Sequence, residues 1–313
     1  MEAKAIILGC PFDSLKDLYT ILKERASLEV LNIQDIRSFN QSTEVIKLKN
    51  GKSLSIQDVK CSFIRYPYDL IPPHNETFEL RERTEFLKSI GLLLNTVSVN
   101  AIQSTWMLRN RLFSLIEARK YGADVPNSEL YQHVIKERNS ESRSILKAIG
   151  NCFVNESQAD VNNTLLSFLR KETDGEDMAF ILPANFTDCI DIETYVEVVG
   201  VAFTQEAVIS EQEYRGYLVG DRFFQYKRAS SKFVDRSTSD YLSTSHMLSQ
   251  NNQKALRSLV DTYNLGYLCF DFIHKDGIDY IVDINPYGSM PNTDSITEVH
   301  TALAELMINK ATK

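Results

Sequence analysis

Two apolar runs near the end of the chain, separated by a short polar turn, constrain its fold more than any other feature. Residues 266–292 read GYLCFDFIHKDGIDYIVDINPYGSMPN, with turn residues at 275–277. This pattern predicts a buried β-hairpin, because each run has the length and composition of a strand. Asp271 and Asp283 lie at similar distances from the turn, so pairing of the strands would bring their side chains together. The sheet that contains the hairpin must therefore accommodate two acids, with Asn285 just beyond them.

Two carboxylates inside a sheet repel each other and lose hydration, so they require a positively charged partner. One interpretation is a Mg²⁺ ion, which prefers oxygen ligands from carboxylates, amides and substrate phosphates. The alternative is that Asp271 caps a strand and that Asp283 forms an ion pair with an Arg or Lys. The loop NPYGSMPN that follows is rich in Pro, Gly and Asn, residues that allow a backbone to approach a ligand closely. The loop therefore favours the metal interpretation.

Length and composition set the class of protein. A chain of 313 residues is long enough for two or three lobes, and 43% hydrophobic residues argue against disorder. A formal net charge of -8 disfavours nucleic acid as a partner, and the apolar runs are too short to span a membrane. The five cysteines are an odd number without a CxxC pair, which is typical of reduced, buried thiols in a cytoplasm. We therefore expect a cytoplasmic globular protein.

The order of expected elements predicts an α/β (α+β) fold. The start of the chain predicts a βαβ unit, and the pair Asn50-Gly51 predicts the turn of a second hairpin. Residues 79–94 and 105–121 each predict one helix, the latter ended by Gly122, and VSVNA predicts a short strand that ends at Asn100. Residues 127–205 predict a small α/β unit with a helix at 158–172, and antiparallel strands follow.

A lysine lies inside one of the expected strands of this middle unit. Lys147 in SRSILKAIG has apolar neighbours, an arrangement that is costly unless the ammonium group contacts an anion. The alternative is that its aliphatic stem lies along an edge strand while the charged end reaches water.

The hairpin and its loop resemble the metal-binding end of an ATP-grasp ligase. The resemblance implies that Asp271, Asp283 and Asn285 hold Mg²⁺, with Mn²⁺ as the alternative ion, against the phosphates of ATP. Asp283 stands where the family usually has Glu, and its side chain is shorter by one methylene group.

Upstream segments resemble the nucleotide-binding parts of the same family. FTQEAVISEQEYRGYLVGD resembles its hinge strand, which implies that backbone groups near adenine come from Gln205, Glu206, Ala207 and Val208, and that Glu213 binds the ribose hydroxyls. An ordinary surface strand is the alternative for this segment. The resemblance also assigns Lys147 and Arg111 to the nucleotide phosphates, and leaves GNCFVNES or KETDGED as the loop that covers them.

Residues 100–130 resemble the junction between lobes in microviridin-type peptide ligases and ribosomal-protein glutamate ligases. Arg111 stands where that group usually has Lys, and Ser128 where it usually has Thr. The resemblance implies three domains: an N-terminal pre-ATP-grasp α/β domain at 1–105, a small central α+β domain at 106–204, and a C-terminal α+β domain with an antiparallel sheet and the metal site at 205–313.

The resemblance further implies a reaction. A carboxylate takes the γ-phosphoryl group of ATP, and an amine or hydroxyl then displaces phosphate from the acyl phosphate. Arg215 and Arg228 would bind the carboxylate or the phosphoryl group. Asp235 would accept the proton of the nucleophile, or simply pair with Arg236.

The expected substrate is a ribosomal precursor peptide, with leader and core, in which ester or amide crosslinks form between side chains. Two alternatives stay open: a ligase that adds a free amino acid to a peptide or protein terminus, and a catalytically silent ATP-binding regulator. A homodimer is compatible with the family.

Overall fold

The structure is a computed structural model that describes residues 4–9, 15–64, 78–131, 144–147, 178–181, 189–191, 202–206, 208, 210, 212–228, 241–286, 288 and 296–313. Ala207, Asp235, the helix expected at 158–172 and both candidate phosphate loops lie outside these residues.

The chain begins with a parallel sheet in the order β2-β1-β6. Its strands are β1 (Ala5–Gly9), β2 (Glu29–Asn32) and β6 (Val59–Ile64), and helix α1 (Lys16–Arg25) connects β1 to β2. The connection confirms the predicted βαβ unit, in which a helix covers one face of a parallel pair.

A small antiparallel sheet separates β2 from β6 in the sequence. It contains β3 (Ile36–Asn40), β4 (Val45–Leu48) and β5 (Ser53–Ser55). Gly51 has a φ of +85°, a value that glycine adopts readily, in the turn between β4 and β5. The predicted hairpin at Asn50-Gly51 is therefore confirmed.

The helix predicted at 105–121 is two helices, so that prediction was wrong. α2 (Phe78–Leu93) is continuous, but α3 (Ile102–Leu108) and α4 (Arg111–Lys120) are interrupted before Arg111. Asn110 is extended, and its side-chain oxygen accepts a hydrogen bond from the backbone N–H of Phe113 at 2.9 Å. An Asn cap starts a new helix because it satisfies a free N–H group of the first turn.

The segment VSVNA was also predicted wrongly as a strand. It forms two isolated bridges, Ser62 with Ser98 and Asn100 with Leu265. A single bridge on each side leaves no ladder of hydrogen bonds that would make a strand.

The sheet with the longest strands, which we call the largest sheet, lies in the last third of the chain and has the strand order β14-β13-β12-β15-β16, antiparallel throughout. Its strands are β12 (Glu213–Val219), β13 (Arg222–Arg228), β14 (Tyr241–Ser243), β15 (Tyr267–Lys275) and β16 (Ile278–Asn285). Asp276 and Gly277 join β15 to β16 with φ values of +52° and +80°. Two successive positive φ values are typical of the tight hairpin turn, so the predicted hairpin is confirmed.

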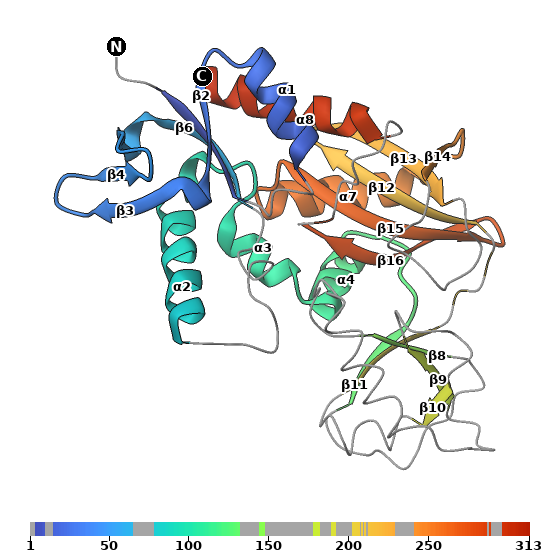
Figure 1. Ribbon diagram of the computed structural model, residues 1–313. Coiled ribbons are helices and arrows are strands. Elements are labelled where there is room, and N and C mark those ends of the chain that lie inside the picture. Colours follow the sequence, from blue (N-terminus) through green and yellow to red (C-terminus); the bar gives the residue numbers. More distant parts are fainter. Residues whose placement is uncertain are drawn as a thin grey trace.

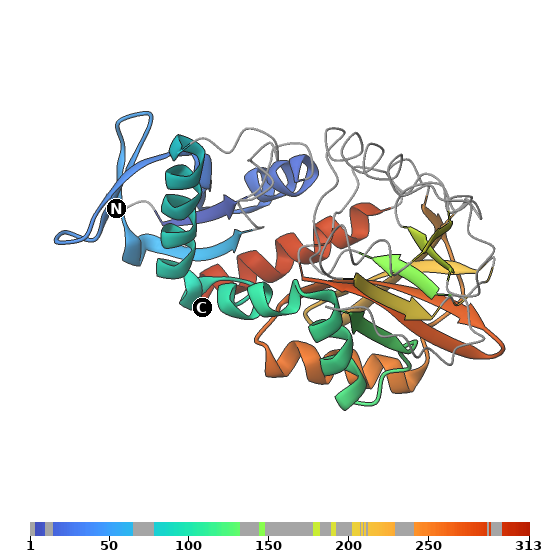
Figure 2. The same ribbon diagram turned by 90° about the horizontal axis from the view of Figure 1, so that it is seen from below.

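Helices cover both faces of this sheet (Figure 1). α4 and α7 (Gln250–Thr262) share one apolar core with it, which includes Leu115, Leu256 and Phe270. α8 (Thr297–Thr312) shares the other core, and the same core includes residues of α1, β1 and β6. Figure 2 shows α8 between the first sheet and the largest one. The last helix therefore joins the beginning of the chain to its final sheet.

A second five-stranded sheet has the order β10-β9-β8-β11-β7. It consists of β7 (Ser128–Tyr131), β8 (Ser144–Lys147), β9 (Met178–Ile181), β10 (Cys189–Asp191) and β11 (Ala202–Glu206). Only β8 and β9 run parallel. The mixture of helices with parallel and antiparallel sheets confirms the predicted α/β (α+β) class, while the domain limits at residues 105 and 204 stay a prediction.

Among the described residues, no helix is both long and apolar enough to cross a membrane.

Candidate active site

The two acids of the hairpin lie side by side in the largest sheet. Asp271 on β15 and Asp283 on β16 are direct cross-strand partners, and Asn285 is the partner of Cys269. The register shifts between Asp271 and Phe272, so β16 has one extra residue beside the acids. Because side chains alternate along a strand, Asp271, Asp283 and Asn285 share one face.

Asp271 is buried and binds two arginines. Arg215, its partner on β12, places Nε 2.8 Å from Oδ1 and Nη2 3.0 Å from Oδ2. Arg228 on β13 donates from Nη2 to Oδ2 at 3.0 Å, and its Nη1 lies 3.0 Å from Glu213 Oε1. Two guanidinium groups therefore neutralise a carboxylate that is only 3% exposed.

The acids keep both arginines charged. Burial alone would lower the pKa of Arg215, but the negative charge of Asp271 raises this pKa well above its ordinary value. The pKa of Arg228 is also raised, because Asp271 and Glu213 outweigh the effects of burial and of the neighbouring Arg215. These groups act as fixed positive charges and not as proton donors to a reaction.

A third arginine contacts the second acid. Arg111, the first residue of α4, places Nε 3.1 Å from Oδ1 of Asp283. The ion pair predicted as the alternative for Asp283 is therefore present. Together with Glu213, the two acids balance the three guanidinium groups, so these six side chains have no net formal charge. We call the six residues, together with Asn285, the charged cluster.

The donor set of the charged cluster fits a hard divalent cation. Asp271, Asp283 and Asn285 offer only oxygen ligands on one face, which suits Mg²⁺ and also Mn²⁺. Oδ2 of Asp271 accepts hydrogen bonds from both Arg215 and Arg228, so an ion would bind through Oδ1 of Asp271 and through Asp283, because each carboxylate oxygen has two lone pairs.

Asn100 positions the backbone around these ligands, a role that its sequence context did not indicate. Its buried amide oxygen accepts from the backbone N–H groups of Gly266 and Tyr267 at 2.9 and 2.8 Å. Its Nδ2 donates to the carbonyl oxygens of Tyr267 and Pro286 at 2.9 and 3.0 Å. One side chain therefore joins the start of β15 to the residue directly after Asn285.

The loop after β16 also requires close backbone packing. Tyr267 donates its hydroxyl proton to the carbonyl oxygen of Gly288 at 2.7 Å. A Cβ atom on Gly288 would lie 2.0 Å from Cβ of Cys269, a distance that no side chain can tolerate. The glycine predicted to permit close approach thus packs against β15 itself.

The predicted hinge leads from the second sheet toward the acids. β11 pairs with β8, and Phe203 is the partner of Lys147, whose backbone alone is described. Gln205 is buried, and the N–H of Glu206 donates to the carbonyl oxygen of Asn127 at 2.8 Å. Val208 packs in a small apolar cluster with Ile273 and Val282, and Val282 directly precedes Asp283. The hinge and the acids are therefore neighbours, while Lys147 keeps its phosphate role as a prediction.

Sequence comparison identifies no relative: no family model matches, and no curated protein matches the chain. Comparison with solved structures finds proteins with a similar fold. The macrocyclase MdnC from Microcystis aeruginosa MRC, bound with the precursor peptide MdnA, has a TM-score of 0.66 and 14% identity, covering 97% of this chain and 99% of that one. The ATP-grasp ligase PsnB, complexed with a minimal precursor, has a TM-score of 0.65 and 13% identity, covering 99% and 100%.

A third structure extends the agreement. A RiPP-associated ATP-grasp ligase from Chryseobacterium gregarium, in complex with ADP and a leader and core peptide, has a TM-score of 0.62 and 14% identity, covering 98% and 97%. These matches span both chains almost completely, and they confirm the fold that the hairpin, hinge and junction segments implied. The chain therefore has the fold of the ATP-grasp ligases.

Proposed function

We propose that the chain is an ATP-dependent, ADP-forming ligase that installs ester or amide crosslinks between side chains of a ribosomal precursor peptide. The charged cluster carries this proposal, because it places three oxygen ligands and three guanidinium groups together at the largest sheet. Phosphoryl transfer requires such positioning and neutralisation of charge, and little covalent chemistry from the protein.

The residues divide into two groups in the proposed reaction. Asp271, Asp283 and Asn285 hold Mg²⁺, which neutralises charge on the phosphates when bound. Arg215 and Arg228 orient the substrate carboxylate, because a guanidinium group can donate two parallel hydrogen bonds to it. Arg215 donates two hydrogen bonds to the carboxylate of Asp271 and Arg228 donates one, which supports the assignment of a carboxylate to this pair of arginines.

The nucleotide would lie between the hinge and the charged cluster. Backbone groups from Gln205 to Val208 would contact adenine, Glu213 the ribose, and Lys147 with Arg111 the phosphates. PsnB has been solved with a minimal precursor, Mg and ADP, which supports ATP and Mg²⁺ as cofactors here. Mn²⁺ remains the alternative ion.

The peptide substrate is supported by the complexes of the similar structures. MdnC was solved with its precursor peptide, and the Chryseobacterium gregarium ligase with a leader and a core peptide. A second candidate is a ligase for free amino acids, supported by the D-alanine–D-alanine ligase from Bacillus anthracis complexed with ATP. The TM-score for that structure is 0.50 against 0.66 for MdnC, which favours the peptide substrate.

The test combines the protein with ATP, Mg²⁺ and the peptide encoded beside its gene, chosen for a core rich in Thr, Ser or Lys together with acids. We expect release of ADP and loss of one water per crosslink in the peptide mass. Asp283→Asn should abolish both signals, while Asp276→Asn in the exposed hairpin turn serves as the matched control.

Two outcomes would contradict the proposal. Formation of AMP with pyrophosphate would exclude an acyl phosphate made from the γ-phosphoryl group. ATP binding without turnover, for the peptide and for free amino acids alike, would instead indicate the silent regulator.

A further inference from the structure

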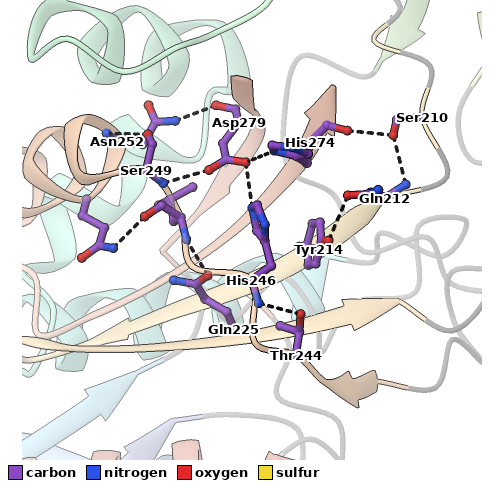
Figure 3. Close-up of polar contacts among 12 residues, drawn as sticks. Ser210, Gln212, Tyr214, Gln225, Thr244, His246, Ser249, Asn252, His274 and Asp279 are labelled. Atoms are coloured by element: carbon purple, nitrogen blue, oxygen red, sulfur yellow. Dashed lines mark hydrogen bonds and ion pairs between the residues drawn. The ribbon is translucent and has the colours of Figure 1, made fainter. Parts of the chain in front are cut away.

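A second polar cluster lies at the largest sheet (Figure 3). It consists of His246, His274 and Asp279. His274 on β15 and Asp279 on β16 are cross-strand partners beside the hairpin turn, and His246 comes from the segment between β14 and α7. Because His274 is three residues from Asp271, its side chain points away from the charged cluster.

Both imidazole rings direct a nitrogen at the same carboxylate oxygen. Oδ1 of Asp279 lies 2.9 Å from Nε2 of His246 and 2.7 Å from Nδ1 of His274. These three atoms all lie within 4.8 Å of one another, and the two ring centroids are 4.6 Å apart. Two nitrogens and one oxygen therefore converge on one point.

Surrounding groups hold two of the three side chains in place. The backbone N–H of Ser249 donates to Oδ2 of Asp279 at 2.8 Å, which leaves Oδ1 for the imidazoles. The ring of Tyr214 stacks on His246, with centroids 4.7 Å apart and an interplanar angle of 22°. Partners of this kind orient the ligands of metal sites and strengthen binding.

We propose that His246, His274 and Asp279 bind Zn²⁺. Two imidazole nitrogens and one carboxylate oxygen are ligands that Zn²⁺ takes in tetrahedral sites with an open fourth position. The two histidine side chains are 25% and 28% exposed, so water or another donor can reach that position. Ligand atoms about 2.0–2.1 Å from the ion would be about 3.3 Å apart in a tetrahedron, so each side chain must withdraw by a few tenths of an ångström.

The site would link three segments of the chain. His246 belongs to the segment that leads into α7, and Asp279 is the second residue of the hairpin's second strand. The carbonyl oxygen of His274 accepts a hydrogen bond from Ser210 in the predicted hinge at 2.7 Å. Zn²⁺ at this position would connect the segment before α7 to the hairpin, beside the hinge.

The competing explanation for this arrangement is that the three side chains form hydrogen bonds with one another and bind no metal. A neutral imidazole carries one N–H, so each histidine can donate one hydrogen bond to Oδ1 of Asp279. Glutamine at either position keeps an N–H donor but removes the imidazole ligand. His246→Gln and His274→Gln therefore separate the two explanations.

The experiment titrates the chelator-treated full chain with Zn²⁺ by calorimetry, and with Co²⁺ by visible absorption, in the absence of ATP and peptide. We expect one equivalent to bind, with the absorption of tetrahedral Co²⁺, and Zn²⁺ to raise the melting temperature. Each glutamine variant should lower the affinity for Zn²⁺ by more than about tenfold. Losing a residue that only hydrogen-bonds a metal ligand already lowers metal affinity by about tenfold or more, and here a ligand itself is lost. Asp276→Asn, which removes an exposed carboxylate from the adjacent turn, should bind as the unmodified chain does.

Absence of Zn²⁺ binding, or an affinity in both glutamine variants equal to that of the unmodified chain, would overturn the proposal. The melting temperatures of the metal-free variants are compared with that of the metal-free unmodified chain. Equal temperatures would show that the variants are folded, so that their weaker binding comes from the missing ligand. The result is independent of ligase activity, because neither nucleotide nor peptide is present.

Discussion

Arg215 contacts both carboxylate oxygens of Asp271, at 2.8 and 3.0 Å, from the neighbouring strand of the largest sheet. Removing one partner of a buried ion pair leaves the other charge without compensation, and here Asp271 compensates two guanidinium groups. We predict that Asp271→Ala lowers the free energy of unfolding by roughly 3–5 kcal/mol in urea titrations. Arg222→Gln, which breaks the exposed pair with Glu305, should cost less than about 1 kcal/mol. Equal costs for the two variants would contradict this account of the pair.

The short acid at position 283 gives a second prediction. Asp283→Glu adds the methylene group that the ATP-grasp family usually has at this position, so it should preserve turnover and lower the Mg²⁺ concentration needed for half-maximal rate. Asp283→Asn removes the charge and should reduce turnover by at least about a hundredfold. Rates of ADP release across a Mg²⁺ titration provide the measurement.

The fold should survive both changes, because Asp283 is only partly buried, as is Arg111, with which it forms an ion pair. Unchanged turnover in Asp283→Asn would remove this residue from the metal site.

The amide of Asn100 gives a third prediction, because it makes four hydrogen bonds inside the protein. Asn100→Ala leaves these buried backbone groups unsatisfied and should cost at least about 2 kcal/mol of stability. It should also raise the Mg²⁺ requirement, since Pro286 follows the ligand Asn285. Asn50→Ala in the exposed turn between β4 and β5 is the control, and urea unfolding with Mg²⁺ titration is the measurement. An unaltered Mg²⁺ requirement would limit Asn100 to a role in stability.

Two buried thiols give a prediction for pH. Burial raises the pKa of Cys61 and of Cys269 from 9.0 to about 12. Both thiols are therefore protonated in the folded chain at about pH 8, and alkylating reagents should modify them only after unfolding. Peptide mapping of samples alkylated with and without urea checks this directly.

The same shifts predict how stability depends on pH. Between pH 9.0 and about 12 the two thiols keep their protons in the folded state and lose them in the unfolded state. The contribution of the buried thiols to the free energy of unfolding is therefore complete below pH 9.0 and is lost as pH rises toward about 12. Replacing Cys269 by Ala should flatten that part of the stability curve. A fall of the same steepness in this variant would assign the effect to other groups.

Local patterns in the sequence predicted the parts of the structure that depend on neighbouring residues. The hairpin and the pairing of Asp271 with Asp283 follow from strand composition, turn residues and counting from the turn. The break before α4 was predictable in the same way, because Asn110 is a favourable helix cap. Contacts of the arginines were not predictable, since they depend on β12 lying between β13 and β15, an order that the sequence does not specify locally.

The two histidines also differ in how far their contacts were predictable from the sequence. The pairing of His274 with Asp279 follows from the register of the hairpin, and could have been found by counting from Gly277. His246 reaches them from outside the hairpin, and only the packing of the segment before α7 brings it there.

The position of α8 has a consequence for how the protein is made. Val299, Leu303 and Met307 share a core with Ile6 and Phe63 of the first sheet, which lie far earlier in the sequence. During synthesis that face of the first sheet is covered by α1 alone until α8 emerges, since contacts so distant along the chain form late. A fragment that ends near residue 105 would therefore expose this apolar face to water, so the expected product is aggregation and not an independent domain.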